Sequence, residues 1–366
     1  MLNLLIMSND ECIAEFSGGK LNITNAPLLP LHLSRTGDIE VWLSQRAIDE
    51  HRINSRLLKK ALRLENKDDI NTALHFNAAT ITDTYWVKPL DSKLTYDDVR
   101  FKENYFDMLA LRGDPDSFNH KPSRTPELTN TGSFEKCWRL IDGKWWMYKS
   151  ESAVEQFTEL FAYYLMAALN IPAAVYEKDD GYVRTLDFTN DASVNFETAY
   201  GIIGEESDYR KVYRILKELD SGVAEAYVMM TFFDGLIFNM DRHEHNFGVL
   251  RDVRTGKILS MAPLYDHNIA LISRGFPTDI SRKSDRLISD FAELILDENI
   301  KMKLPQLTGK TVAQATQRAA AHFDEAAKLP ENTERFVVEY VMNGFARIKE
   351  LSKLPVQSPK RNEPER

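Results

Sequence analysis

Three polar residues in the second half of the chain, Asp241, Asn246 and Asp266, have the types and spacing suited to phosphoryl transfer from ATP. In that chemistry one carboxylate accepts the proton of the attacking hydroxyl group. An amide oxygen and a second carboxylate hold Mg²⁺, which neutralises charge on the phosphates. We therefore predict a single site that contains two carboxylates and one amide.

An apolar helix and a β-hairpin are the elements expected to position this site. The helix is predicted over residues 225–239 and ends just before Asp241. The hairpin strands, 247–250 and 257–261, carry the chain out and back, so that Asp266 returns to the neighbourhood of the amide. Protein kinases use the same order of catalytic Asp and Asn, hairpin and metal-binding Asp.

A kinase site also needs a cation on the phosphates, held by a carboxylate on a helix. Lys149 ends the second strand of another predicted hairpin, 137–149, which turns at an Asp-Gly pair. The helix predicted over 153–169 offers Glu155 and Glu159. We favour Glu159, because it lies deeper in the apolar run, where a charge has more need of a partner.

The loop before this hairpin, residues 129–136, is a candidate cover for the phosphates. It has one glycine, Gly132, and three hydroxyl side chains, those of Thr129, Thr131 and Ser133. It contains neither a GxGxxG pattern nor a Walker motif, so its own signal for phosphate binding is poor.

The composition of the 366-residue chain is that of a globular protein, with 43% hydrophobic and 28% charged residues. Its 46 basic and 55 acidic residues give a formal net charge of −9, which argues against a protein that only binds duplex DNA. A local basic cluster lies in the stretch 39–66, which we expect to be helical. We interpret this cluster as a solvated helix face; it comprises Arg46, Arg52, Arg56, Lys59, Lys60 and Arg63.

The two cysteines, Cys12 and Cys137, form no CxxC motif and are too few to staple a chain of this length. The N-terminus lacks the cationic start of a signal peptide. The longest apolar run, 161–169, is too short to span a bilayer. We expect a soluble, cytoplasmic protein with no membrane partner.

The order of elements predicts an α+β fold. Short strands are expected at 13–16, 21–23 and 182–186, and helices dominate the end of the chain, over 285–302, 311–328 and 331–353. Thr311 and Asn332 are the expected N-caps of the last two helices.

These residues resemble one known family, the HipA-like serine/threonine kinases, whose fold is similar to those of protein kinases and phosphatidylinositol kinases. The resemblance runs from about Thr129 to Lys353. Its best matches are the loop Asp241-Arg242-x3-Asn246-Phe247, the segment Pro263–Asp266, and Glu159 in the helix before Asn170-Ile171. The resemblance implies a two-lobed kinase-like fold with a small β-containing N-lobe and a mainly helical C-lobe.

The expected organisation is an N-terminal α+β extension of unclear role over 1–110, an N-lobe over 111–190, a C-lobe over 191–355 and a disordered tail over 356–366. The resemblance makes Asp241 the catalytic base, and Asn246 and Asp266 the Mg²⁺ ligands. It places Lys149 on the ATP phosphates, paired with Glu159.

The resemblance also assigns the nucleotide contacts and the partners. It implies that the strand end Thr185, Leu186, Asp187 and Phe188 is the hinge that receives adenine. Gly132 and Ser133 belong to the phosphate loop, which autophosphorylates in related toxins. The implied cofactors are ATP and Mg²⁺, and the implied partners are a protein substrate with a Ser or Thr acceptor and an antitoxin or other regulatory protein.

Three alternatives stay open. The first is a small-molecule or lipid kinase, because the phosphate machinery does not encode the acceptor. The second is a kinase-fold regulatory protein of a toxin–antitoxin or mobile-element locus, with an excisionase-like role and DNA bound on the Arg46–Arg63 face. The third is a zinc hydrolase that uses His243, His245, His267 and Asp266.

Overall fold

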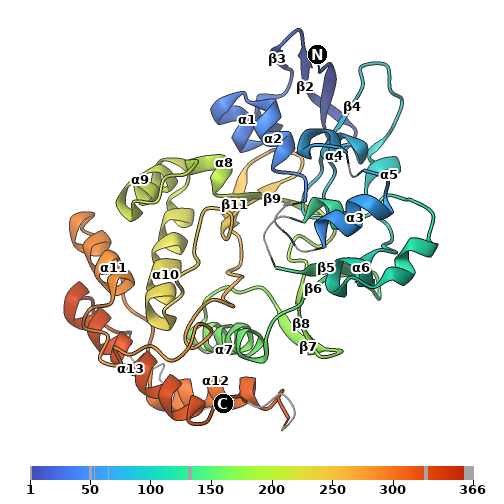
Figure 1. The fold of residues 1–366 in the computed structure, drawn as a ribbon. Helices are drawn as coiled ribbons and strands as arrows, with labels where there is room; N and C mark the ends of the chain where they lie inside the picture. Colours follow the sequence, from blue (N-terminus) through green and yellow to red (C-terminus); the bar gives the residue numbers. More distant parts are fainter. Residues whose placement is uncertain are drawn as a thin grey trace, which may run out of the picture. The chain divides into compact units, whose positions relative to one another are not determined.

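Figure 1 shows the computed structural model of the chain, which describes residues 2–48, 52, 54–64, 66–130, 134–324 and 329–357. The chain divides into two compact units whose segments alternate along the sequence. The first unit comprises Met1–Glu151, Ala174–Glu205 and Glu244–Ala262, and the second comprises Ser152–Ala173, Glu206–His243 and Pro263–Arg366. The expected division at 110, 190 and 355 stays a prediction.

The first unit begins with an antiparallel sheet of strand order β3-β2-β1-β4. Alternate side chains of β1 and β2, such as Leu4, Ile6 and Ile13, enter a core that the first helices cover. The strands are β1 (Leu4–Ser8), β2 (Glu11–Ser17), β3 (Lys20–Ile23) and β4 (Tyr85–Lys88). The helices of this region are η1 (Ala26–Leu28), α1 (Leu31–Thr36), α2 (Ile39–Ser44), α3 (Ser55–Ala61), α4 (Asp69–His75), α5 (Tyr96–Val99) and α6 (Asp107–Arg112).

The second sheet of this unit contains the hairpin that ends at Lys149. Its strands are β5 (Lys136–Ile141), β6 (Lys144–Lys149), β7 (Tyr176–Asp179) and β8 (Tyr182–Leu186), in the order β5-β6-β8-β7, and η2 (Pro115–Asn119) and η3 (Pro126–Thr129) precede them. Ile141 pairs with Lys144, so Asp142 and Gly143 form a two-residue turn, with φ of 50° and 74°. Positive φ at both positions is what a type I′ turn requires, and the predicted hairpin is confirmed.

A third sheet, of order β11-β10-β9, carries the second predicted hairpin. Its strands are β9 (Val194–Thr198), β10 (Gly248–Asp252) and β11 (Ile258–Met261), and the short helix α8 (Tyr200–Ile203) follows β9. At Gly248 a Cβ atom would lie 2.1 Å from the carbonyl oxygen of Glu197, so only glycine allows β10 to approach β9 this closely.

The second unit is helical, with α7 (Ala153–Leu169), α9 (Tyr209–Leu219), α10 (Ser221–Ile237), α11 (Arg286–Asp297), α12 (Gly309–Ala320) and α13 (Thr333–Ser352). Helix α7 packs on α12, and α10 packs on α9, α11 and α13 (Figure 1). Ser152 and Glu155 close a capping box at the start of α7, and Asn170 ends this helix with φ of 56°. The predicted α+β class is confirmed.

Two local expectations need correction. The stretch 39–66 is not one helix, because α2 ends at Ser44 and α3 starts at Ser55. The N-cap of α12 is Thr308, whose hydroxyl accepts from the amide of Thr311, and not Thr311 itself. Residues 358–366 of the expected tail lie outside the described residues, whereas Val356 pairs with Leu304 in an isolated bridge.

Among the described helices, none is both long and apolar enough to cross a membrane.

Candidate functional site

The loop that carries Asp241 is fastened to the end of α10 inside the second unit. The backbone amide of Asn239 donates to the carbonyl of Asp234. The side-chain nitrogen of Asn239 donates to the Asp234 carboxylate at 2.8 Å. The amide of Asp241 in turn faces the side-chain oxygen of Asn239 at 3.4 Å. The helix end therefore fixes where the loop begins.

Arg242 ties this loop to the segment that contains Asp266. Its guanidinium makes two bonds to the Asp234 carboxylate, of 2.8 and 3.1 Å, and both side chains are buried. It also donates to the carbonyl of Tyr265 at 2.9 Å and contacts Nε2 of His267 at 3.0 Å. Because Tyr265 and His267 flank Asp266, one guanidinium sets the position of Asp266 relative to the Asp241 loop.

Asp241 and Asp266 are close enough for their charges to interact. Burial raises the pKa of Asp241 and the Asp266 carboxylate raises it further, while His243, Arg274 and Arg242 oppose the rise. Asp266 has a φ of 62°, a left-handed conformation that non-glycine residues adopt rarely and that is frequent at functional sites. Two carboxylates that repel each other suit a site where a cation binds.

Glu159 lies in the buried face of α7 and accepts a hydrogen bond from the amide of His267 at 3.0 Å. The helix carboxylate therefore holds the backbone next to Asp266. Glu155, the alternative considered from the sequence, is used in the capping box with Ser152.

Asn246 belongs to the first unit, where it is buried between two backbone hydrogen bonds. The carbonyl of Glu244 accepts from the amide of Tyr200 at 3.0 Å, and the carbonyl of Phe247 accepts from the amide of Ala199 at 2.8 Å. The expected meeting of Asn246 with Asp241 and Asp266 involves both units and stays a prediction.

Lys149 is buried at the end of β6 in the first unit. Its Nζ atom lies 3.6 Å from Oε1 of Glu151 and 5.7 Å from the centre of the Tyr176 ring. Glu151 was not singled out from the sequence. The expected pair of Lys149 with Glu159 joins the two units and stays a prediction.

The segment predicted as the adenine hinge leaves the second sheet at the end of β8. The amide of Leu186 donates to the carbonyl of Val175, and the amide of Asp187 donates to the carbonyl of Trp145. These two amides are therefore engaged within the protein, and an adenine ring would use other backbone groups of the segment. Asp187 folds the following turn through bonds to Thr189 and Asp191, whereas Phe188 packs edge-on against Phe196.

Gly132 and Ser133, which the sequence places in the phosphate loop, lie outside the described residues, as does Thr131. The flanks of this loop are described and rest on a buried carboxylate. Glu127 accepts from Asn130, Asn104 and the amide of Trp138, at 2.7–2.9 Å, and lies 3.9 Å from the Arg52 guanidinium. Burial raises the pKa of Glu127 to about 8, although Arg52, the amide of Trp138 and Asn104 oppose the rise.

The far end of the same loop is held by the region before it. Arg52 donates to the carbonyl of Lys136, and the side-chain amide of Asn54 donates to the Glu135 carboxylate at 2.7 Å. Both ends of the expected phosphate loop are thus anchored within the first unit.

The side chains present fit Mg²⁺ and ATP. Carboxylate and amide oxygens, as in Asp266 and Asn246, are the ligand types that Mg²⁺ prefers. At the nucleotide segment, Oγ1 of Thr185 is buried and finds no hydrogen-bond partner within the described part of the chain. Buried hydroxyl groups normally have a hydrogen-bond partner, and a polar atom of a bound nucleotide would supply one here.

The zinc alternative fits less well. Nε2 of His267 faces the Arg242 guanidinium, a hydrogen-bond donor, so its lone pair is directed at a cation and away from a metal. His245 stacks on Tyr200 in the first unit. Within the described ranges, no group of three or more His, Cys, Asp or Glu side chains is placed to hold a metal ion.

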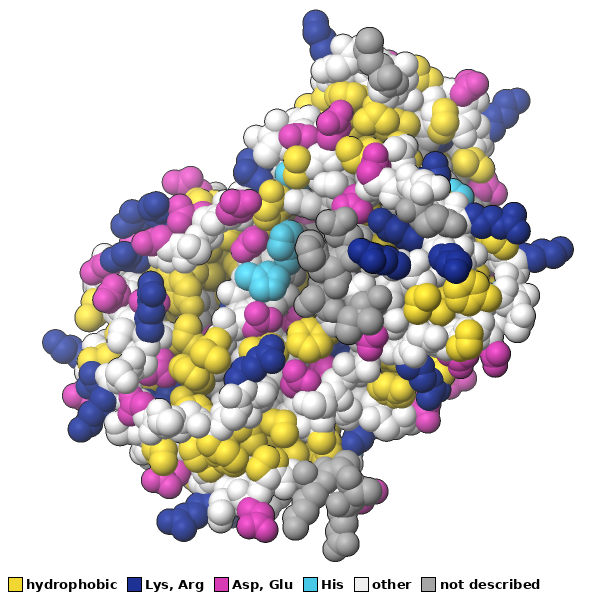
Figure 2. Space-filling view, in the orientation of Figure 1, with side chains coloured by type: hydrophobic (Ala, Val, Ile, Leu, Met, Phe, Trp, Pro, Cys, Tyr) yellow, Lys and Arg dark blue, Asp and Glu magenta, His cyan; other side chains and the backbone are white. Residues whose placement is uncertain are grey.

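The basic cluster of the sequence is not one solvated face, which corrects that interpretation. Arg46 is buried in an ion pair with Asp83 at 2.7 Å, and Arg52 is buried beside Glu127. On the face seen in Figure 2, many Lys and Arg side chains are scattered with acidic side chains between them. A DNA-binding face that needs both buried arginines is therefore not supported.

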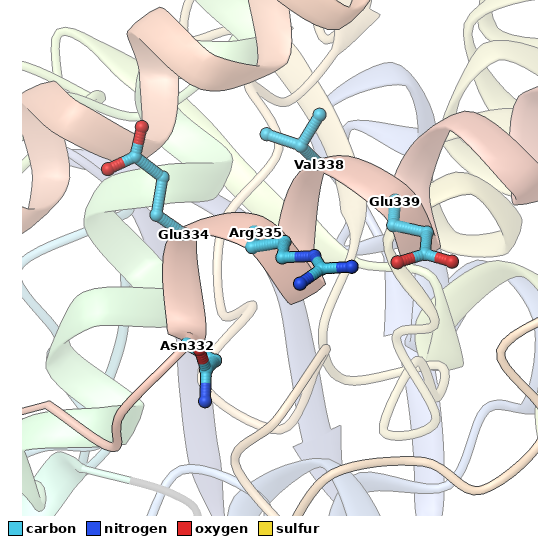
Figure 3. Close-up of a pocket in the computed structure, with 5 residues that line it drawn as sticks. All are labelled: Asn332, Glu334, Arg335, Val338 and Glu339. Atoms are coloured by element: carbon cyan, nitrogen blue, oxygen red, sulfur yellow. The ribbon is translucent and has the colours of Figure 1, made fainter.

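A hollow of about 560 Å³ lies at the start of α13. Figure 3 shows that charges of both signs surround it; the lining residues are Asn332, Glu334, Arg335, Val338 and Glu339. None of the predicted site residues lines this hollow.

Comparison with solved structures shows which known fold this chain resembles. HipA, in the toxin–antitoxin complex of HipA, HipB and operator DNA from Shewanella oneidensis MR-1, matches with a TM-score of 0.55. The match covers 96% of this chain and 98% of that chain, at 13% sequence identity. The chain has a HipA-like fold.

A second structure with similarity to this chain is the proinflammatory kinase CtkA of Helicobacter pylori. It matches with a TM-score of 0.41 and 15% identity, over 59% of this chain and 92% of its own. No protein-family model and no curated protein matches the chain. The predicted two-lobed, HipA-like fold class is confirmed by the first likeness.

Sequence reasoning missed Asp234, and it included Arg242 in a motif without giving it a positioning role. A usable signal existed, because Asp234 is the single charge in the apolar stretch 226–240 and a buried carboxylate requires a partner. Arg242 is the first cation after that stretch.

Proposed function

We propose that this HipA-like chain is an ATP- and Mg²⁺-dependent serine/threonine kinase. The observation that carries the proposal is the buried guanidinium of Arg242, which fastens the Asp241 loop to the residues on either side of Asp266. Kinase chemistry needs a proton acceptor and a metal ligand held in fixed relation. A phosphotransferase is the general class that this arrangement supports.

Each residue has a defined task in this proposal. Asp241 accepts the proton of the acceptor hydroxyl, and its raised pKa makes it a stronger base than an ordinary carboxylate. Asn246 and Asp266 hold Mg²⁺, which when bound neutralises charge on the phosphates. Lys149 binds the phosphate oxygens, and its buried position strengthens that attraction.

Other parts of the chain bind and orient the nucleotide. The segment Thr185–Phe188 receives the adenine ring through backbone groups, with Oγ1 of Thr185 as an added polar contact. Residues 129–136, with Gly132 and Ser133, cover the phosphates, and Glu127 and Arg52 hold the two ends of this loop. Glu159 keeps the backbone beside Asp266 in place.

The partners follow from the proposed activity. The acceptor is a Ser or Thr hydroxyl of a protein. The structural neighbour is described together with HipB and operator DNA, which supports a regulatory protein as a second partner for this chain. The cytoplasm is the compartment where such a kinase meets ATP.

The decisive experiment incubates the purified full chain with Mg²⁺ and γ-labelled ATP, beside Asp241→Ala. Label that enters the wild-type chain and is absent from the variant supports the kinase, and mapping of the labelled residue tests Thr129, Thr131 and Ser133 as autophosphorylation sites. A protein, a lipid and a small-molecule acceptor, each added separately, distinguish the acceptor classes. Absence of both label and Mg·ATP binding would overturn the proposal.

A further inference from the structure

Three rings from separate parts of the first unit form a face-to-face stack. His32 of α1 stacks on Tyr200 of α8, with ring centres 5.8 Å apart and planes inclined by 10°. Tyr200 stacks on His245 in turn, at 4.9 Å and 15°. The stack ends at His245, which immediately precedes the predicted metal ligand Asn246.

Tyr200 also fixes the backbone around Asn246. Its amide donates to the carbonyl of Glu244 at 3.0 Å, and the preceding amide, that of Ala199, donates to the carbonyl of Phe247 at 2.8 Å. The two acceptors lie on either side of Asn246. The stack therefore holds the segment 244–247 through the His245 ring, and the two hydrogen bonds hold it through its backbone carbonyls.

The N-terminal region also holds the backbone of Tyr200 and Gly201. Arg35 of α1 donates to the carbonyls of Gly201 and Tyr200, at 3.1 and 3.2 Å. At Gly201 a Cβ atom would lie 3.3 Å from the amide nitrogen of His32, so glycine permits the close approach of α8 to α1. The start of α1 is bound as well, because the amide of Leu31 donates to the Glu197 carboxylate at 2.6 Å.

His32 contributes its ring face to this contact. Its side chain is buried, and neither ring nitrogen has a hydrogen-bond partner in the described part of the chain. Burial and Arg35 both lower the pKa of His32, while Asp38 opposes the fall, and the net shift favours the neutral ring. A buried ring that favours the neutral form is suited to stacking on Tyr200.

We propose that Tyr200, braced by His32 and Arg35 of the N-terminal region, is a positioning residue for Asn246. This inference rests on the proposed kinase function for the role of Asn246 as a Mg²⁺ ligand. It assigns a task to the region 1–110, which then forms part of the machinery that holds the metal. Residues that orient metal ligands typically change metal affinity by 10–100-fold when they are removed.

The test compares Tyr200→Leu with Tyr200→Phe in the full chain. Leucine removes the aromatic ring and with it the stack. Phenylalanine keeps the ring and the two backbone bonds from residues 199 and 200. We expect Tyr200→Leu to raise the Mg²⁺ concentration for half-maximal label transfer about tenfold or more, with a smaller change at saturating Mg²⁺. Tyr200→Phe should stay within about twofold of the wild type. Equal Mg²⁺ dependence of Tyr200→Leu and wild type would overturn the inference.

A second readout separates failure of the brace from failure of the kinase. Hydrogen exchange at the amides of Ala199 and Tyr200 reports their bonds to the 244–247 segment without any need for activity. Faster exchange in Tyr200→Leu, but not in Tyr200→Phe, supports the brace even if no label is transferred by the wild type. Unchanged exchange overturns it. If Tyr200→Leu does not fold, His32→Leu removes only the outer ring and is expected to give a smaller shift in both readouts.

Discussion

The guanidinium of Arg242 and the carboxylate of Asp234 form a buried ion pair eight residues apart, with nitrogen–oxygen distances of 2.8 and 3.1 Å. The pair joins the end of α10 to the loop that follows it. The remaining nitrogen of Arg242 reaches the backbone before Asp266. Loss of either partner therefore acts on the fold and on the candidate site together.

Asp234→Asn is expected to lower the free energy of unfolding by about 3–5 kcal/mol, because it leaves the Arg242 charge buried without its carboxylate. Label transfer should fall as the Asp241 loop loses its anchor. Urea unfolding measures the first effect. The control is Glu350→Gln, which breaks the more exposed pair of Arg347 and Glu350 and should cost less than about 1 kcal/mol. Equal losses in the two variants would contradict a structural role for the buried pair.

Asp241→Asn is expected to reduce phosphoryl transfer by about 10²–10⁴-fold, the range for loss of a general base. The melting temperature should stay the same or rise, because the repulsion between Asp241 and Asp266 is removed. Transfer assays and thermal unfolding on the same samples check both statements. Glu218→Gln, at an exposed position of α9, is the matched control and should change neither. Full activity of Asp241→Asn would exclude it as the base.

The raised pKa of Glu127 leads us to expect a free energy of unfolding that depends on pH. Its folded-state pKa of about 8 lies above the ordinary 4.5, so between these values the folded protein keeps a proton that the unfolded chain releases. The free energy of unfolding contributed by this group therefore falls as pH rises through that window, by up to about 1.4 kcal/mol per pH unit. Glu127→Gln should flatten this slope in urea titrations from about pH 5 to about pH 8. An unchanged slope would mean that Glu127 is ionised in the folded state.

Gly248→Ala is expected to destabilise the third sheet, because the new Cβ would lie 2.1 Å from the Glu197 carbonyl oxygen. A cost of about 3 kcal/mol is reasonable for a clash with backbone. Gly309→Ala is the control, since the nearest atom to its Cβ is a methyl group of Val338 at 3.9 Å. Thermal unfolding of the two variants makes the comparison. Similar melting temperatures would indicate that β10 and β9 can separate without loss of stability.

Elements with strong local signals were predictable from the sequence. The Asp142-Gly143 turn fixed the register of β5 and β6, and the apolar periodicity of 153–169 gave the bounds of α7. Both depend on neighbouring residues alone. The order of Asp241, Asn246 and Asp266 was likewise visible, because it is a matter of spacing.

Long-range pairings were not predictable in this way. Strand β9 is short and pairs with β10, whose residues come some fifty positions later. The burial of Arg46 and Arg52 depends on acidic side chains that are distant in sequence, Asp83 and Glu127. A run of basic residues by itself gives no information on such partners, so it resembled a solvated face.

The alternation of the two units along the chain constrains how the protein can be made and divided. The polypeptide passes from one unit to the other after residues 151, 173, 205, 243 and 262. No single cut in the gene separates one unit from the other intact. During translation, the first unit lacks β10 and β11 until the ribosome has added Met261, by which time α7, α9 and α10 of the second unit have already been synthesised.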